Sequence, residues 1–503
     1  MFGEMWGTSE PSKDNVESLR ADGAFFEDGR LRNVVRDAIS ILDSLGYRYL
    51  WVDALCVIQD DPSKMFYVQR MDIIYTRAIC TIVAAGSSNA DQPVWGVREG
   101  SRPPVKSEFH NGCSLVRVGM EADEAFSATP SESRSWTLQE RLLSPRLLVF
   151  TQSEIFLQCS KEKHQENPPR SMSCSYNDSR FRKRPLTYNL FHGMLGRNSD
   201  VEWKRLRKMI KERPDRSPYR FELIFICCDL MSTYTYRSLT REDDVYNAFM
   251  GIENHVSARC GAVFLSAIPI AGFPIALMWY SPSARSRRRV APAENSKYSH
   301  ELPFPSWSWI AWTEGISWAS PLHLKDSLDR FKHCWAYSSG LHSSTIFISD
   351  DGQRMSLHTA QVQALKNPRL VFKYLEFQAD SVPISRFGLR PLRDWDPNLC
   401  AIEIHDSEGN HCGAVLGVSY DNAEKLIGTE LVEIFATSRR SKSPPDRADY
   451  VIHSGMHYYS EHPLVNCLVI KWDEQFAKRV AVAQVHQDAW RKSVGEFKRV
   501  VLV

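Results

Sequence analysis

The chain has 503 residues, of which 43% are hydrophobic and 24% are charged. This length leaves room for about two to four domains, and a composition with 25 Gly and 26 Pro excludes collagen-like, coiled-coil and wholly disordered proteins. Lys and Arg total 62 against 60 Asp and Glu, so the net charge of +2 provides no global field that would attract nucleic acid or an anionic membrane.

The first 160 residues alternate helix-like and strand-like segments in the manner of a parallel α/β sheet. Between residues 31 and 45, apolar residues recur at helical spacing, and Gly46 provides a left-handed stop. This pattern predicts a helix. The apolar run Tyr49–Val52 then predicts a short strand that ends at Asp53.

A second helix and a second strand are predicted next. Asp61 is the expected cap of the helix, with Pro62 at its first position and apolar residues continuing to Ala78. The β-branched and apolar run Ile79–Ala85 predicts the strand, which ends at a loop rich in Gly and Ser.

Residues Ser135–Leu143 predict another helix, and Leu147–Phe150 and Ile155–Cys159 predict a pair of strands. The polar stretch Lys161–Pro185 has few residues that could be buried and is typical of a linker. We therefore expect an N-terminal domain at residues 1–160, a linker at 161–185 and a C-terminal region at 186–503.

The C-terminal region has weaker periodicity. Helices are predicted at Val201–Arg213 and Asp243–His255. Strands are predicted at Leu370–Phe377, Ala401–Ile404, Ala414–Val418 and Val465–Lys471. These elements indicate an α+β region, to which the sequence assigns no role.

One segment, Gly261–Tyr280, is uncharged and long enough to cross a bilayer. Pro269, Gly272 and Pro274 lie near its centre, where each Pro removes a helical hydrogen bond that lipid cannot replace. We therefore expect two short buried segments and no membrane partner.

Twelve cysteines are too few for a disulfide scaffold, and no basic and then apolar signal segment opens the chain, so we expect reduced thiols and a cytoplasmic location. The motifs GxxxxGK[ST], GxGxxG, HExxH and GxSxG are absent, and no cofactor is predicted from motifs. Cys400, His405, His411 and Cys412 come closest to a metal-ligand set, but they flank an apparent turn between strands, and we expect no metal there.

Three polar residues are predicted at the carboxyl end of the first strand, where ligands meet a parallel sheet. They are Asp53, Gln59 and Asp60. Asp53 could hold a ribose hydroxyl or act as an acid or base, and the alternative is that it caps the following turn.

Glu140 is the second carboxylate of interest. It lies one helical turn from Trp136, so a ring and a carboxylate could frame a planar cationic group such as nicotinamide. In the alternative, Trp136 belongs to the core and Glu140 pairs with Arg134, Arg141 or Arg146.

Two segments resemble the signature blocks of the fungal heterokaryon-incompatibility (HET) domain. The first is YLWVDALCVIQDD at residues 49–61, and the second is RSWTLQERLLSPR at residues 134–146. The resemblance extends from Trp6 to about residue 160. The family usually opens with a strand that ends in Ser-Tyr-x-Trp-Gly, and only Trp6 and Gly7 match it, so we expect this strand to be largely absent from a truncated N-terminus.

The resemblance implies a TIR/flavodoxin-like parallel sheet with flanking helices. It also implies a role in self/non-self recognition, in which the domain contacts protein partners or itself and triggers programmed cell death when incompatible cells fuse. Some TIR domains cleave NAD, so NAD is a candidate substrate, with Glu140 or Asp53 stabilising the oxocarbenium-like ribose. The expected ligand-binding residues are Trp6, Gly7, Gln59, Asp60, Arg134, Trp136 and Gln139.

Overall fold

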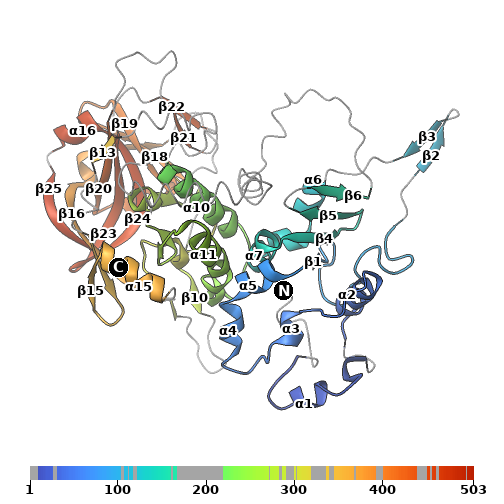
Figure 1. The fold of residues 1–503 in the computed structure, drawn as a ribbon. Coiled ribbons are helices and arrows are strands. Elements are labelled where there is room, and N and C mark those ends of the chain that lie inside the picture. The colour runs from blue at the N-terminus through green and yellow to red at the C-terminus, as the bar shows by residue number, and fades with distance from the viewer. Residues whose placement is uncertain are drawn as a thin grey trace. The chain divides into compact units, whose positions relative to one another are not determined.

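The computed structural model describes residues 10–26, 31–103, 107–110, 113–116, 122–159, 162–166, 219–270, 272–282, 286–290, 300–301, 303–318, 336–338, 345–367, 370–391, 400–438, 450–453, 456–459, 464–493 and 495–503. The chain forms two compact units (Figure 1). The first comprises Met1–Glu202 and Arg237–His255, and the second comprises Trp203–Tyr236 and Val256–Val503.

The first unit contains a four-stranded sheet. Its strands, in spatial order, are β1 (Thr81–Val83), β4 (Arg146–Phe150), β5 (Ile155–Cys159) and β6 (Lys163–Gln165). β1 and β4 are parallel, whereas β4, β5 and β6 are antiparallel neighbours. The expected α/β class is confirmed, but the sheet is mixed and not wholly parallel, and a TIR/flavodoxin-like arrangement is not confirmed. The cause is a tight turn, in which the Thr151 N–H donates to the Glu154 carbonyl at 3.0 Å, because so short a connection joins antiparallel strands.

Three helices of the first unit were predicted. They are α2 (Asn33–Ser44), α5 (Met71–Arg77) and α7 (Ser135–Leu143). α2 buries Val34, Val35, Ala38 and Ile41 on one face, as its apolar spacing requires, and Gly46 follows it with a φ of 72°. Shorter helices complete the set: α1 (Val16–Leu19), α3 (Asp53–Cys56), α4 (Lys64–Val68) and α6 (Ala122–Ser127).

Two local predictions in this unit are wrong. Tyr49–Val52 belongs to no helix or strand and pairs with no strand in the described part of the chain. The Val52 carbonyl instead accepts the Cys56 N–H at 2.7 Å, which turns the chain into α3. The helix expected from Asp61 to Ala78 is two helices, because the Asp61 carboxylate accepts the Ser63 N–H in a turn and the backbone leaves the helical region at Arg70.

The segment Arg237–His255 belongs to the first unit although it lies far along the chain. Ser238 exchanges backbone hydrogen bonds with Ser133 and Ser135, at 2.6 and 2.9 Å. Glu132 accepts from both Arg141, at 2.5 Å, and Arg237, at 2.9 Å. The segment thus fixes the start of α7. It includes a turn of 3₁₀ helix (Glu242–Asp244) and the beginning of α11 (Asn247–Cys260), where one helix was predicted.

The second unit is built on an eleven-stranded sheet. Five of its strands form a closed ring: β16 (Phe372–Pro383), β20 (Thr429–Ser438), β23 (Leu464–Asp473), β24 (Phe476–His486) and β25 (Glu496–Leu502). β25 closes the ring by pairing with β16 along its length and with β24 at the single pair Ala477 and Leu502. β18 (Ala401–His405) and β19 (His411–Leu416) extend the sheet, so the four predicted strands are confirmed.

The described part of the uncharged segment Gly261–Tyr280 is mostly buried, but it forms four short elements where two were predicted. They are β7 (Phe264–Leu265), β8 (Ile268–Pro269), α12 (Phe273–Ala276) and β9 (Trp279–Tyr280). In the described residues we find no helix with the length and apolar character needed to cross a membrane. The helix predicted at Val201–Arg213 and most of the linker predicted at Lys161–Pro185 lie outside the described residues, apart from β6.

Candidate functional site

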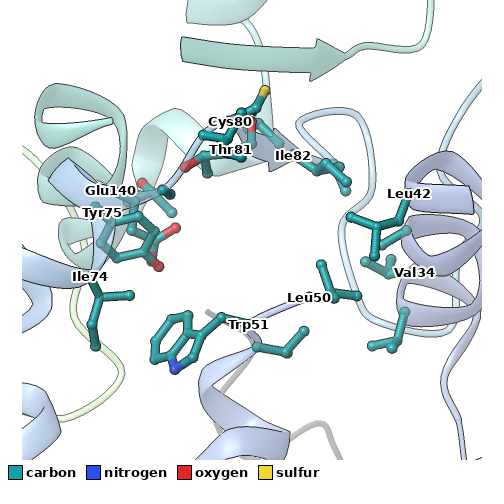
Figure 2. A pocket seen from close by; sticks show the side chains of 18 of the residues that line it. Val34, Leu42, Leu50, Trp51, Ile74, Tyr75, Cys80, Thr81, Ile82 and Glu140 are labelled. Atoms are coloured by element: carbon teal, nitrogen blue, oxygen red, sulfur yellow. Dashed lines mark hydrogen bonds between the residues drawn. The ribbon is translucent and has the colours of Figure 1, made fainter. Parts of the chain in front are cut away.

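The first unit encloses a cavity of about 670 Å³ (Figure 2). Its walls come from α2, residues 47–52, the end of α5, β1 and residues 130–140. Most lining side chains are apolar, among them Val34, Leu42, Leu50, Ile74 and Ile82. A volume in this range, with few polar groups, is typical of ligand-binding pockets.

Local sequence explains why these walls form. The apolar face of α2 packs against the sheet side through Val34 and Ile41, in one cluster with Phe150. Met71 and Tyr75 of α5 pack against Leu143 of α7, with Trp51 beside them. The lining residues thus belong to three separate apolar clusters, the third of which contains Val35, Leu50 and Val52.

The polar groups gather at one end. Figure 2 shows Glu140 and Tyr75 on the same side of the cavity, with Trp51 at its lower wall. Arg134, Thr137 and Glu140 follow one another at spacings of three residues, so they share one face of α7 and its N-terminal flank, and all three line the cavity.

The charges at this end act on one another. Burial raises the pKa of the Glu140 carboxyl, and the nearby Asp53 carboxylate raises it further, while the Arg134 guanidinium opposes the rise. Burial likewise raises the pKa of Tyr75 well above its usual value, with Glu140 and Asp53 adding to the effect. Burial lowers the pKa of the Arg134 guanidinium, and the Glu140 and Asp53 carboxylates oppose this decrease. Asp53, Tyr75, Arg134 and Glu140 therefore share one electrostatic neighbourhood.

The predicted site residues are only partly brought together. Glu140 and Arg134 line the cavity, whereas Asp53 influences it through its charge. The Asp53 carboxylate accepts the N–H of the next residue, Ala54, at 2.9 Å, and Asp53 is the first residue of α3 rather than its cap. The Gln59 amide donates to the carbonyls of Asp53 and Val57, at 3.2 and 2.9 Å.

The remaining predicted residues lie elsewhere. Asp60 accepts the Lys13 N–H at 2.9 Å, away from the lining. Trp136 is half-buried and is not among the residues that line the cavity. Gln139 is buried, and its Oε1 lies 2.3 Å from the position that a Cβ would take at Gly251. Trp6 and Gly7 lie outside the described residues.

Sequence reasoning missed the aromatic walls. Trp51 and Tyr75 line the cavity, with ring centroids 6.0 Å apart at an angle of 82°. Both residues occupy apolar positions of segments that were expected to pack into the core. An aromatic residue at such a position does not by itself indicate a binding site. Thr137 could have been found, because it lies three residues before Glu140 on the predicted helix.

Neither thiol nor metal chemistry is supported where the structure describes the chain. Cys56 is exposed, yet its sulfur lies against the backbone of Leu50 and Val52, and this partial burial raises the pKa of the thiol. No group of three or more metal-ligating side chains occurs in the described ranges. His405 and His411 are paired neighbours in the hairpin of β18 and β19, as expected.

Comparison with known proteins finds a similarity to one family in this region. Residues 5–140 match the family model described as heterokaryon incompatibility protein (HET), which confirms the resemblance seen in the sequence. All residues that line the cavity fall within the matched range. The chain matches no curated protein. It also matches no solved structure.

Proposed function

We propose that this protein acts in heterokaryon-incompatibility-type self/non-self recognition, and that its HET domain is a signalling module that induces cell death. The observation that carries the proposal is the match of residues 5–140 to the heterokaryon-incompatibility family. The module contacts a protein partner or a second copy of itself, and the second unit restrains or senses it.

The surface of the domain supports a contact function. Leu45, Tyr47, Tyr49 and Ile79 line the cavity and are also exposed, Tyr49 to 88% of its surface. We call these four side chains the rim patch. An apolar patch around a concave site is typical of an interaction surface.

Expression of the whole chain from an inducible promoter in a filamentous fungus tests the proposal. We expect arrested colony growth and loss of viability, measured with a vital dye. Glu140→Gln should weaken this effect because Glu140 lines the cavity, whereas Glu99→Gln, at an exposed carboxylate outside the lining, should leave it intact. Normal growth with abundant, folded protein would refute the signalling role.

A second candidate function is hydrolysis of NAD, which the group formed by Glu140, Tyr75 and Arg134 favours. The bond between nicotinamide and ribose breaks with its electron pair leaving on nicotinamide. Glu140 as a carboxylate would stabilise the positive ribose until water adds and loses a proton. The aromatic rings of Trp51 and Tyr75 would contact the planar nicotinamide.

Release of nicotinamide from NAD by the purified whole chain tests this candidate. Turnover that Glu140→Gln abolishes and Glu99→Gln preserves would support it. Absence of turnover in a folded protein would remove the enzyme from consideration and leave the signalling proposal unaffected.

A further inference from the structure

One chain connection between the two units carries an inference about how the site is controlled. The boundary falls directly after Tyr236, the residue that follows α10 (Tyr219–Thr235). On the side of the second unit, the Ile316 N–H donates to the Thr235 hydroxyl at 3.0 Å, and the Ser232 hydroxyl donates to the Ile316 carbonyl at 2.8 Å. The last turn of α10 is thus fixed inside the second unit.

Beyond this boundary, Arg237 holds the start of α7 inside the first unit. Its side chain is only 5% exposed, and its guanidinium donates to the Arg134 carbonyl at 3.2 Å and to the Thr137 hydroxyl at 3.3 Å. It also donates to the Glu132 carboxylate at 2.9 Å. Arg134 and Thr137 line the cavity together with Glu140. Two polar residues of the site are therefore positioned by the first residue after the boundary.

The chain between the two anchors has no slack. Thr235 and Arg237 are two residues apart, and two residues of fully extended chain span at most about 7 Å. A longer loop would absorb a displacement of α10, whereas this connection passes it to Arg237 and from there to α7. Ser238 strengthens the connection, because its backbone pairs with that of Ser133 and Ser135.

The start of α7 leaves several polar groups unsatisfied in its present position. Arg134 caps the helix without a side-chain hydrogen bond. The Glu132 Oε1, the Ser135 Oγ and the Gln139 amide are buried, yet they have no hydrogen-bond partner among the residues that the structure describes. Buried polar groups are normally paired. A shift of α7 that gives these groups partners would compensate for lost contacts with Arg237.

We propose that the second unit controls the polar end of the cavity through the single peptide step from Tyr236 to Arg237. When the end of α10 moves, Arg237 withdraws from Arg134 and Thr137, and α7 carries Glu140 to a new position. The coupling is reciprocal, because a partner that holds α7 in place also holds the end of α10. The inference rests on the proposed function, since it gives the route by which the second unit restrains the signalling module.

Hydrogen exchange of the whole chain tests this route. Thr235→Val removes the acceptor of the Ile316 N–H and loosens the end of α10. Exchange in a peptide that covers residues 131–138 should then become about tenfold faster, although these residues belong to the other unit. A peptide that covers β5 should keep its rate, which would show that the first unit stays folded.

Thr429→Val is the matched control. Thr429 is 2% exposed, lies in the second unit and donates its hydroxyl to the Leu426 carbonyl at 2.7 Å, so the variant loses a comparable buried hydrogen bond. It should leave exchange at residues 131–138 unchanged. Arg237→Gln cuts the route itself, so exchange there should be fast in this variant, and adding Thr235→Val should not increase it further.

Unchanged exchange at residues 131–138 in Thr235→Val would overturn the inference. Equal acceleration by Thr235→Val and Thr429→Val would also overturn it, because the effect would then be a general loss of stability in the second unit. Additive effects of Thr235→Val and Arg237→Gln would place the route elsewhere and overturn it as well. Coupling with the expected profile but no growth arrest on expression would instead refute the signalling role alone.

Discussion

Trp51 and Tyr75 meet edge to face at 6.0 Å between ring centroids, although Tyr75 lies in a helix and Trp51 in no helix or strand. The contact joins two walls of the cavity, and Tyr75 is only 5% exposed. Edge-to-face pairs add a modest stabilisation to the apolar area that they bury.

We expect Tyr75→Ala to lower the free energy of unfolding by about 3 kcal/mol, because it removes a buried ring and opens the cavity further. Tyr75→Phe keeps the ring and should cost much less. Urea unfolding followed by circular dichroism measures both. Equal losses for the two variants would show that the hydroxyl, and not the ring, provides the stability.

Glu132 is the common partner of two largely buried guanidiniums, those of Arg141 and Arg237. Glu132→Gln should lower the free energy of unfolding by about 3 to 5 kcal/mol, because it leaves buried positive charge without compensation. Glu17→Gln removes the partner of Arg20 in an exposed pair and should change stability little. Thermal unfolding measures both variants. Similar losses of stability for the two would show that the group formed by Glu132, Arg141 and Arg237 is not important for the fold.

Gly251 leaves room for the buried Gln139 side chain. Gly251→Ala should destabilise the protein by about 1 to 3 kcal/mol, since its Cβ would overlap the Gln139 amide. In a Gln139→Ala background the same substitution should cost less. A double-mutant cycle in denaturant measures this coupling, and additive losses would place the conflict elsewhere.

The buried carboxyl of Glu253 should make the free energy of unfolding depend on pH. The residue is buried, and burial raises the pKa of its carboxyl from 4.5 to about 8, against a smaller effect of its hydrogen bond to Tyr246. Between these two values the unfolded chain loses a proton that the folded chain keeps. Stability should therefore fall as the pH rises through this window, with the full cost present above pH 8.

Unfolding of the Glu253→Gln variant at pH 5 and pH 9 measures this contribution. We expect the variant to gain several kcal/mol over the unmodified protein at pH 9 and little at pH 5. The control Glu99→Gln changes an exposed carboxylate and should follow the unmodified protein at both values. A gain that is the same at both pH values would contradict the assignment.

The sequence predicts elements well where local pattern decides them. α7 has its predicted bounds, and β5 likewise, because apolar spacing and flanking turn residues act within the segment. Tyr49–Val52 has the composition of a strand, but a strand also needs a neighbour at hydrogen-bonding distance. The strand β6 depends on its pairing with β5, which no local pattern indicates.

The same limit applies to the candidate site. Glu140 was found because it lies one helical turn from Trp136 on a predicted helix, and Arg134 because it opens the signature block at residues 134–146. Trp51 and Tyr75 were not, because an aromatic residue that lines a cavity and one that fills a core have the same pattern. The contribution of Arg237 arises from a contact more than a hundred residues away in the chain.

The interleaved course of the chain limits how the protein can be divided. Residues 237–255 return to the first unit after the chain has contributed residues 203–236 to the second. A fragment that stops at residue 160 or 202 would contain every lining residue of the cavity and still lack Arg237 and Ser238, which hold the start of α7. Toxicity or binding measured on such a fragment would report on a domain deprived of one of its own supports.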